Sequence, residues 1–542
     1  MFAGLLASAG VAEARVEPRS PLDAYVEARV ASSAGASERA SAGFETALTA
    51  APDNEVVATQ ALSHAVAAGD WPLALRAART LERRGTLLPD ARFLLLADAF
   101  RGRDWREATR QIDAIERDEL FGFAVPLLRA WRAHGAGEGD PLSFLPGVGT
   151  DSIAAAFSAD HRPLLLVAMN RPEGIALIEG AGSTGPRAIR RRVAAAAVLA
   201  GRGDRARALA LLQGTDAPLV KARALVEQGQ PLPGGVDTPA DGLAQFLTRL
   251  SLDLHGQDLT QLAATFARLA TWLSPDSSDT WIVAAELAGA RDRHETQVAL
   301  LANVADTDPW FEAARDQRIR ALIDGGLREH ALGEAQAAAG AGGASSSDQV
   351  RLGEVLMSMQ RPAEAAQAFG RAITLRGDGA GAYPEWALWL LRGGAHDEAG
   401  DWPQALNALR QAHRLAGEEP LVLNYLGYAQ LVRRENVEEA ERLIREAHRL
   451  APGNSAITDS LGWALFLKGE RAEAIGLLEL AAQGAPADVE INEHLGDAYF
   501  AVGRRAEARF AWAAARVYAE GAAETRLTQK IESGLTPALA AR

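Results

Sequence analysis

Residues 461–486 read LGWALFLKGERAEAIGLLELAAQGAP, and this stretch decides the fold. Ala474 follows Gly462 after twelve residues, the large apolar Leu478 stands four residues further on, and Ala481 follows three residues later. Spacings of four and three place these side chains on one face of a helix. Because glycine and alanine leave no bulk between two helices, the pattern predicts an antiparallel helical pair in close contact, with the large residue filling the gap.

The same pattern recurs through the C-terminal third of the chain. Its glycines are Gly353, Gly393, Gly427, Gly462 and Gly496, spaced by 40, 34, 35 and 34 residues. The alanines that follow are Ala365, Ala405, Ala440, Ala474 and Ala508, the large residues are Phe369, Leu409, Ile444, Leu478 and Trp512, and the second alanines are Ala372, Ala412, Ala447, Ala481 and Ala515. A period in this range is typical of stacked helical hairpins, each of which buries its apolar face against the next.

A turn signal separates the two helices of a hairpin. Residues 400–403 read GDWP, and residues 69–72 repeat these four letters near the N-terminus. Related turns begin at Asp104 and Gly203. Glycine ends one helix, and proline begins the next where no amide donor is needed. We therefore expect helical hairpins through most of the chain, with a degenerate pattern in the N-terminal half.

These residues resemble the tetratricopeptide pattern. The matching positions are Leu461, Gly462, Ala474, Leu478, Ala481 and Pro486 in one unit, and Leu495, Gly496, Tyr499, Ala508, Trp512 and Ala515 in the next. The resemblance implies an all-α fold, a right-handed superhelical solenoid of antiparallel helical hairpins. Residues 400–403, 423–428 and 459–463 also resemble exported or envelope-associated tetratricopeptide proteins of alphaproteobacteria, which implies an envelope compartment.

Stretches rich in glycine, proline or serine mark candidate joints at residues 135–150, 228–242 and 340–348. Between them, the chain divides into a signal-peptide remnant at 1–14, tetratricopeptide-like repeats at 15–135, divergent helical hairpins at 136–240, further tetratricopeptide-like repeats at 241–345, and C-terminal repeats with a capping helix at 346–542. Residues 164–168 fit a strand or a buried helix by periodicity alone. Their helical neighbours favour a helix.

The N-terminal residues 1–14, MFAGLLASAGVAEA, are small and apolar and end in Ala-Glu-Ala, which is similar to the core and cleavage site of a secretory signal. The usual positive start is missing, so we expect the true beginning to lie upstream; the alternative is an ordinary apolar N-terminus. No later segment has the roughly 18 uninterrupted apolar residues of a membrane-spanning helix. The sequence predicts a periplasmic protein without direct membrane insertion, and the alternative is a cytoplasmic one.

Composition argues against several functions. A net charge of -14 argues against nucleic acid as a partner, and the lack of cysteine excludes thiol nucleophiles and cysteine-bound zinc. The histidines form no zinc-binding pair, and the cluster at His396 lies at a packing or surface position of the repeat. The glycine-rich residues 179–186 lack the ending of a phosphate loop, and the arginine run 187–192 is interpreted as a solvated helix face rather than an anion site. We expect no catalytic residue, cofactor or metal.

The first helices of stacked hairpins line a concave groove. In the tetratricopeptide pattern, the groove receives the residues three before, one after and four after the repeat glycine. In this chain these residues are Asn424, Tyr428, Leu431, Asp459, Trp463, Phe466, Glu493, Asp497 and Phe500. Aromatic and acidic side chains favour an extended or helical segment with apolar anchors and basic residues over a C-terminal carboxylate. The alternative is that these aromatics pack against neighbouring helices or a final capping helix at 524–534.

The sequence thus predicts a non-enzymatic scaffold that docks membrane- or envelope-associated proteins and helps to assemble or stabilise their complex. The first alternative is a cytoplasmic adaptor or regulator that uses the same groove. The second is an enzyme, for which the sequence nominates no residue.

Overall fold

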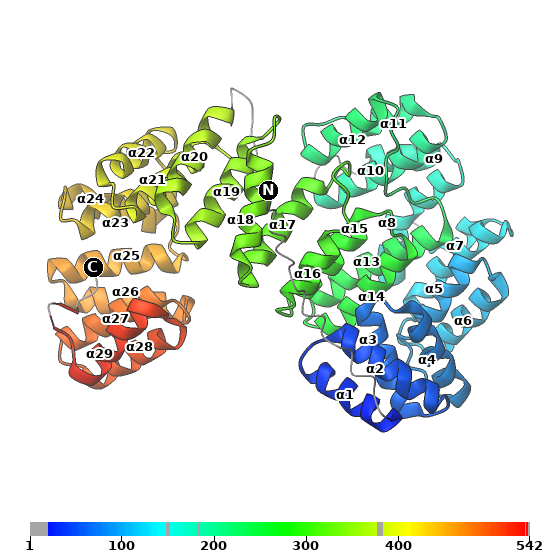
Figure 1. Ribbon diagram of the computed structural model, residues 1–542. Coiled ribbons are helices and arrows are strands. Elements are labelled where there is room, and N and C mark those ends of the chain that lie inside the picture. The colour runs from blue at the N-terminus through cyan, green and yellow to red at the C-terminus, as the bar shows by residue number, and fades with distance from the viewer. Residues whose placement is uncertain (1–19, 148–151, 181–184, 377–382, 537, 540–542) are drawn as a thin grey trace, which may run out of the picture. The chain divides into compact units, whose positions relative to one another are not determined.

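The computed structural model describes residues 20–147, 152–180, 185–376, 383–536 and 538–539 (Figure 1). The signal-like residues 1–14 lie outside these ranges. Within them all regular structure is helical and no strand occurs, so the expected all-α helical repeat fold is confirmed. The chain forms two compact units, and the division falls between Gly325 and Gly326. We call the part up to Gly325 unit 1 and the part from Gly326 unit 2.

Unit 1 carries the first seventeen α-helices of the described residues. They are α1 (Pro21–Ser33), α2 (Ser37–Ala50), α3 (Glu55–Ala68), α4 (Trp71–Arg84), α5 (Arg92–Gly102), α6 (Trp105–Arg117), α7 (Val125–Ala136), α8 (Ile153–Ala168), α9 (Glu173–Gly180), α10 (Pro186–Gly201), α11 (Arg205–Leu211), α12 (Ala217–Glu227), α13 (Pro239–His255), α14 (Thr260–Leu273), α15 (Ser278–Gly289), α16 (His294–Leu301) and α17 (Phe311–Asp324), with 3-10 turns η1 (Gly122–Ala124) and η2 (Pro141–Phe144).

Unit 2 continues the series with hairpins and a last single helix. Its helices are α18 (Arg328–Ala339), α19 (Ser346–Ser358), α20 (Pro362–Arg376), α21 (Glu385–Glu398), α22 (Trp402–Leu415), α23 (Pro420–Val432), α24 (Val437–Leu450), α25 (Ser455–Lys468), α26 (Arg471–Gly484), α27 (Val489–Ala501), α28 (Arg505–Tyr518) and α29 (Gly521–Ser533). The expected boundary at 345/346 therefore lies between α18 and α19, inside unit 2, while those at 135/136 and 240/241 fall within α7 and α13.

In the predicted turns, an aspartate side chain caps the N-terminus of the helix that follows. Asp70, Asp104, Asp204 and Asp401 each precede a second helix, and each carboxylate accepts the backbone N–H three residues on, at 3.1, 3.0, 3.2 and 3.4 Å. Such a cap satisfies an amide that the helix itself leaves without a partner. Gly400 ends the preceding helix at φ +76°, where a side chain would be strained. The turn copies predicted from the sequence are confirmed.

The repeat glycines of unit 2 face the large residues of the neighbouring helix, as the pattern predicts. A Cβ added to each glycine would lie 2.3–2.9 Å from that side chain; the pairs are Gly353 with Phe369, Gly393 with Leu409, Gly427 with Ile444, Gly462 with Leu478, and Gly496 with Trp512. The ten repeat alanines are buried. Each hairpin therefore closes because one helix leaves a space that one large side chain of its partner fills.

We expect Gly496→Ala to lower the free energy of unfolding by about 1–3 kcal/mol, because its Cβ would overlap the Trp512 indole and overpack the hairpin. The added Cβ would lie 2.3 Å from Trp512 Cδ1. Gly476→Ala on α26 is the control, since an added Cβ there meets nothing within 4 Å. That change is expected to stabilise by about 0.5–1 kcal/mol through helix propensity. Urea unfolding followed by circular dichroism measures both, and effects of equal sign would contradict the packing argument.

Unit 1 folds back on itself. Helices α13 and α14 pack against α3, α5, α7 and α8 from the earlier part of the chain (Figure 1). The contact is aromatic: Phe93 of α5 lies 6.2 Å from Phe246 of α13 and 5.3 Å from Phe266 of α14 between ring centroids. Gly242 of α13 leaves room for the buried Trp131 of α7. The first helices α3, α5 and α7 are thus covered by the chain's own helices.

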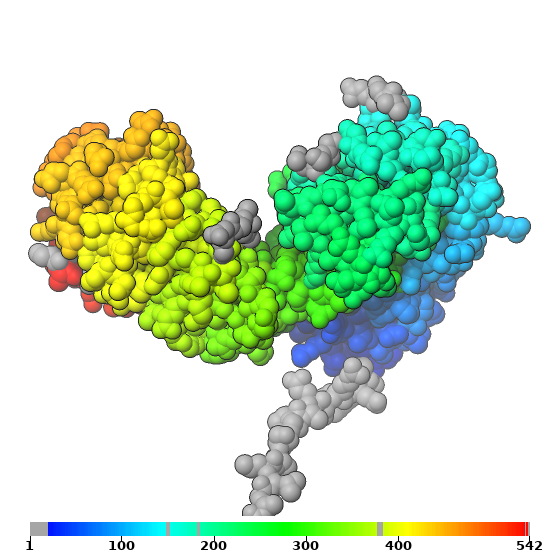
Figure 2. Space-filling view, turned by 90° about the horizontal axis from the view of Figure 1, so that it is seen from above, coloured from blue at the N-terminus to red at the C-terminus, as the bar shows by residue number. Residues whose placement is uncertain are grey.

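Residues 164–168, which the sequence left between strand and helix, are buried in α8, so the helical interpretation is confirmed. Helices α8 to α12 surround an apolar core that includes Val193, Leu211 and Leu219. In the space-filling view the residues of α9 to α12, cyan to green, lie together at the surface of unit 1 (Figure 2).

Candidate functional site

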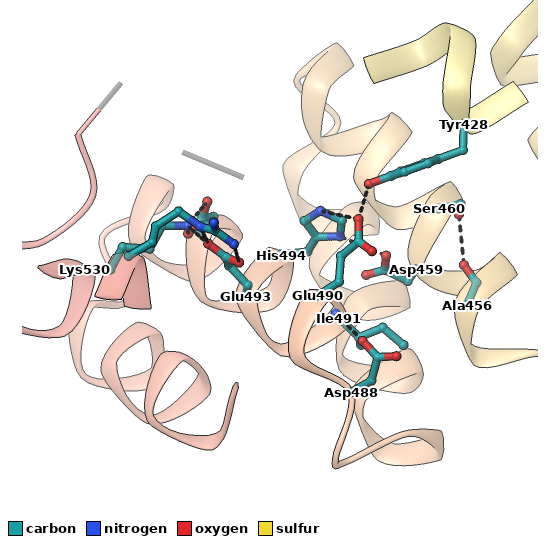
Figure 3. Close-up of polar contacts among 12 residues, drawn as sticks. Tyr428, Ala456, Asp459, Ser460, Asp488, Glu490, Ile491, Glu493, His494 and Lys530 are labelled. Atoms are coloured by element: carbon teal, nitrogen blue, oxygen red, sulfur yellow. Dashed lines mark hydrogen bonds and ion pairs between the residues drawn. The ribbon is translucent and has the colours of Figure 1, made fainter. Parts of the chain in front are cut away.

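Three first helices of unit 2 lie next to one another, α23 beside α25 and α25 beside α27. We call the side that they share the first-helix face. Tyr428 of α23 reaches over α25 and donates its hydroxyl proton to Glu490 of α27 at 2.7 Å. Figure 3 shows this bond, with the His494 ring beside Glu490 and Asp459 below it. The structure therefore brings side chains of three successive repeats together on the face where the sequence placed a groove.

The three groove residues expected on α23 differ in exposure. Tyr428 is half-buried and bonded to Glu490, whereas Leu431 is buried between α23 and its neighbours. Asn424 is half-buried, and its Oδ1 is a buried acceptor with no hydrogen-bond partner in the described residues. Tyr428 and Asn424 thus lie at the surface of the face, and Leu431 supports it from within.

On α25 the expected residues form an aromatic stack. The Trp463 indole lies between Phe466 and His494, with ring centroids 4.9 and 4.1 Å away. Trp463 is 2% exposed, and Asp459 is also buried, while Phe466 is half-buried. Trp463 Nε1 and Asp459 Oδ1 lack hydrogen-bond partners among the described residues. The stack therefore buries two unmatched polar atoms and leaves Phe466 at its edge.

On α27 two expected residues are engaged by the last helix, α29. Glu493 pairs with Arg526 at 2.7 Å and with Lys530 at 2.6 Å, and Asp497 pairs with Lys530 at 2.7 Å. Glu493, Asp497 and Lys530 are all buried. Phe500, half-buried, lies 5.6 Å from the Trp512 ring. These side chains hold α29 in place, so the part of the first-helix face open to a partner is formed by α23, α25 and Glu490.

His494 is the titratable side chain at the centre of the first-helix face, between Asp459 and Glu490. Its Nδ1 lies 2.8 Å from Asp459 Oδ2, and its Nε2 lies 3.9 Å from Glu490 Oε1. Burial lowers the pKa of His494, but the carboxylates of Asp459, Glu490 and Asp497 together outweigh burial and raise it above 6.5. Burial and the nearby Glu490 raise the pKa of Tyr428, so its hydroxyl stays protonated and donates. When His494 is protonated, its ring stacks on the Trp463 indole and pairs with the Asp459 carboxylate, and these contacts link α25 to α27.

We expect unit 2 to lose stability as the pH rises through the folded pKa of His494. Because that pKa lies above the unfolded value, the stabilisation by protonated His494 is complete below the unfolded pKa and disappears above the folded one. His494→Gln should therefore cost more free energy of unfolding at about pH 5.5 than at about pH 9. His330→Gln on the exposed side of α18 is the control. An equal cost for His494→Gln at both pH values in urea unfolding would contradict this assignment.

His396 and Asp397, the other acid-base cluster of the sequence, are engaged within unit 2. Burial lowers the pKa of His396, and its Nδ1 lies 3.8 Å from Asp401. The neighbouring Asp397 pairs with Arg433.

In the described part of the chain, no three His, Cys, Asp or Glu residues are grouped to hold a metal ion. Among those same residues, none of the helices combines the length and apolar character that crossing a membrane requires.

The arginine run 187–192 is not a solvated face beyond Arg187. Arg190 pairs with Asp279 of α15 at 2.7 Å, and Arg191 pairs with Asp160 of α8 at 3.3 Å. Acidic residues far away in the sequence supply these partners, which is why the run looked solvated from its own neighbours. The cavity beside these residues, about 70 Å³, is lined by these same paired charges.

No protein-family model matches the chain, and no curated protein matches it. Several solved structures do. TTC0263, a thermophilic TPR protein of Thermus thermophilus, is 21% identical over 34% of this chain and 98% of its own, with a TM-score of 0.30. Cut9–Hcn1, an APC/C hetero-tetramer, gives 14% identity over 96% and 97% of the two chains, with a TM-score of 0.38.

A third similar structure is the C-terminal part of a TPR repeat-containing protein from Cytophaga hutchinsonii. It is 16% identical over 44% of this chain and 97% of its own, with a TM-score of 0.28. These identities and TM-scores are low. The helical repeat fold therefore rests on the helices, caps and glycine contacts of this chain itself.

Sequence reasoning missed four residues of the first-helix face and of its contact with α29, namely Glu490, His494, Arg526 and Lys530. His494 and Glu490 precede Gly496 by two and six residues, which are not groove positions of the pattern. The sequence does contain a feature that could have identified the two cations of α29. Arg526 and Lys530 stand four residues apart in an expected capping helix. Buried acids on the previous helix require such cations.

Proposed function

We propose that this chain is a non-enzymatic protein-binding scaffold, and that its first-helix face receives an extended or helical segment of a partner protein. The observation that carries the proposal is the set of partly exposed aromatic and acidic side chains that three successive repeats bring together on this face: Tyr428 of α23, Phe466 of α25 and Glu490 of α27. The unmatched polar atoms of Asp459 and Trp463 are enclosed beneath them.

The charge and exposure of the face favour a segment with basic residues and apolar anchors. Tyr428 and Phe466 are half-buried and offer aromatic contact area, which contributes strongly at protein interfaces. The Glu490 side chain is 64% exposed beside them, and the chain carries a net charge of -14. Acidic groups at the rim of an interface attract and orient a basic partner.

The finer part of the proposal is that the partners are envelope proteins and that the scaffold acts in the periplasm, where it assembles or stabilises their complex. Residues 1–14, with their likeness to the end of a secretory signal, support this part. Fractionation of cells that carry a tagged chromosomal copy tests it. Recovery of the protein from the periplasm is the expected result, and recovery from the cytoplasm would favour an adaptor or regulator there.

Affinity capture of the same tagged protein tests the face. We expect one predominant partner that is lost with the variant Tyr428→Ala, Phe466→Ala and retained with Phe510→Ala. Phe510 lies on α28, outside the first-helix face, and is 75% exposed, so its replacement controls for the loss of a surface aromatic. All variants are checked for helicity and thermal midpoint. A partner list that the double variant leaves unchanged would place binding on another surface.

A further inference from the structure

A small cavity in unit 1 is lined by three arginines and by no acidic residue. Arg268 comes from α14, and Arg291 and Arg293 come from the connection between α15 and α16. Its volume is about 50 Å³, room for one small group. Ser37, Ser63, Gln261, Thr265 and Thr296 supply further polar side chains to the lining. Three guanidinium groups with hydroxyls and an amide around them form an environment for an anion.

Two of these cations have no partner within the described protein. The side chains of Arg268 and Arg291 make no ion pair or hydrogen bond with any described residue, whereas Arg293 donates to Ser37 Oγ at 3.0 Å. Burial lowers the pKa of Arg268, and burial with the nearby Arg293 lowers that of Arg291; no carboxylate raises either one. Arg268 and Arg291 are half-buried. Cations that are partly removed from water in proteins are normally paired, as the half-buried Arg190 is with Asp279 at 2.7 Å.

The arrangement around Arg268 holds the guanidinium in place without neutralising it. A Cβ at Gly69 would lie 2.5 Å from an Arg268 guanidinium nitrogen, so the group rests against the carboxyl end of α3. The partial negative charge of a helix end supports a cation there but supplies only a fraction of a charge. The site therefore retains an excess of positive charge in a chain whose net charge is -14.

The cavity adjoins a larger aromatic groove, and the two share Arg268 and Thr296. The groove has a volume of about 760 Å³ and is lined by the indoles of Trp71, Trp272 and Trp281. Trp71 and Trp272 stack with centroids 4.9 Å apart, and all three indoles are half-buried. Partly exposed indoles next to a charged pocket provide apolar contact beside an ion-pairing site.

We propose that this site binds an acidic peptide segment of a partner protein. One carboxylate enters the cavity of Arg268, Arg291 and Arg293, and the flanking residues lie along the three indoles. A peptide fits better than a free ion because the groove is many times larger than the cavity. A single carboxylate suffices because the groove itself is mixed in charge, with Glu38 and Glu295 beside Arg39 and Arg101, so the excess of positive charge lies in the cavity. The basic segment proposed for unit 2 is a different ligand, so the two sites are independent.

The test selects ligands for the full-length protein from a phage-displayed library of random twelve-residue peptides with blocked C-termini. We expect the selected peptides to share an Asp or Glu next to apolar or aromatic residues. Synthetic copies should bind Arg268→Gln, Arg291→Gln about thirtyfold or more weakly, the effect of removing partners from a buried charge pair. The control variant Arg84→Gln, Arg106→Gln removes two exposed arginines of unit 1 and should bind like wild type. Peptides without acid enrichment, or equal binding by both variants, would overturn the proposal.

A competition with inorganic phosphate separates a peptide site from a site for a free anion. We expect phosphate to displace the peptide only at concentrations far above the peptide's Kd, because it makes no contact with the indoles. If phosphate binds as tightly as the peptide, the cavity is a free-anion site and the peptide proposal fails. The variant Tyr428→Ala, Phe466→Ala changes only unit 2. Whether that variant loses the partner of unit 2 does not bear on peptide binding at the arginine cavity of unit 1.

Thermal unfolding without ligand tests whether Arg268 serves binding or structure. Arg268→Met removes a half-buried cation that has no acidic partner, so we expect the thermal midpoint to stay the same or rise. Arg190→Met is the matched control: it leaves Asp279 buried without its cation and should lower the midpoint. An equal fall for both variants would assign Arg268 a structural role and overturn the proposal.

Discussion

Replacing Lys530 with methionine is expected to lower the free energy of unfolding by about 3–5 kcal/mol, because it leaves Asp497 buried without its cation and leaves Glu493 with Arg526 alone. Lys530 is 0% exposed, and its Nζ lies 2.6 Å from Glu493 and 2.7 Å from Asp497. Methionine keeps an unbranched apolar chain close to that of lysine and removes the ammonium group, so the change acts mainly on the charge. Urea unfolding of the full chain, followed by circular dichroism, measures the effect.

Gln529→Met is the matched control for Lys530→Met, since Gln529 lies on the exposed side of α29 and receives the same new residue. Its effect should be small. Glu493→Gln and Asp497→Asn, added to Lys530→Met, should recover part of the lost stability because the buried charges are then removed together. If Lys530→Met and Gln529→Met cost the same, α29 is not held by this ion cluster.

Trp463→Ala is expected to lower the free energy of unfolding by about 3–5 kcal/mol, because it opens a cavity in the stack of Phe466 and His494. Trp463 is 2% exposed, and its ring centroid lies 4.1 Å from that of His494. The same unfolding experiment measures the effect, and the near-ultraviolet spectrum reports the loss of the stacked indole. A cost below about 1 kcal/mol would show that the stack adds little to stability.

Phe510→Ala, at an exposed position of α28, is the control for Trp463→Ala and should cost little. Loss of a partner in Trp463→Ala would follow from a destabilised fold as readily as from a lost contact. Tyr428 and Phe466 are half-buried, so replacing them changes the first-helix face with less damage to the core.

Much of unit 2 could be predicted because its determinants lie close together in the sequence. A repeat glycine, the large residue opposite it and the turn between them all fall within one hairpin, as Gly462, Leu478 and Gly469 do. The predicted groove positions lie on α23, α25 and α27, which are neighbours in the structure. They did not reveal which side chains remain accessible, because that depends on α29 and on the stacking of Trp463 against His494 of the next repeat.

The sequence by itself determined the helical hairpins, their turns and their period, because these follow from spacing within about 34 residues. Only the tertiary structure decided that α13 and α14 cover the first helices of unit 1, and that Arg268, Arg291 and Arg293 gather around one cavity. The contact between Arg293 and Ser37 joins residues 256 positions apart. Such contacts have no local period, because they depend on how the chain returns to helices formed much earlier, and so they leave no pattern in the sequence.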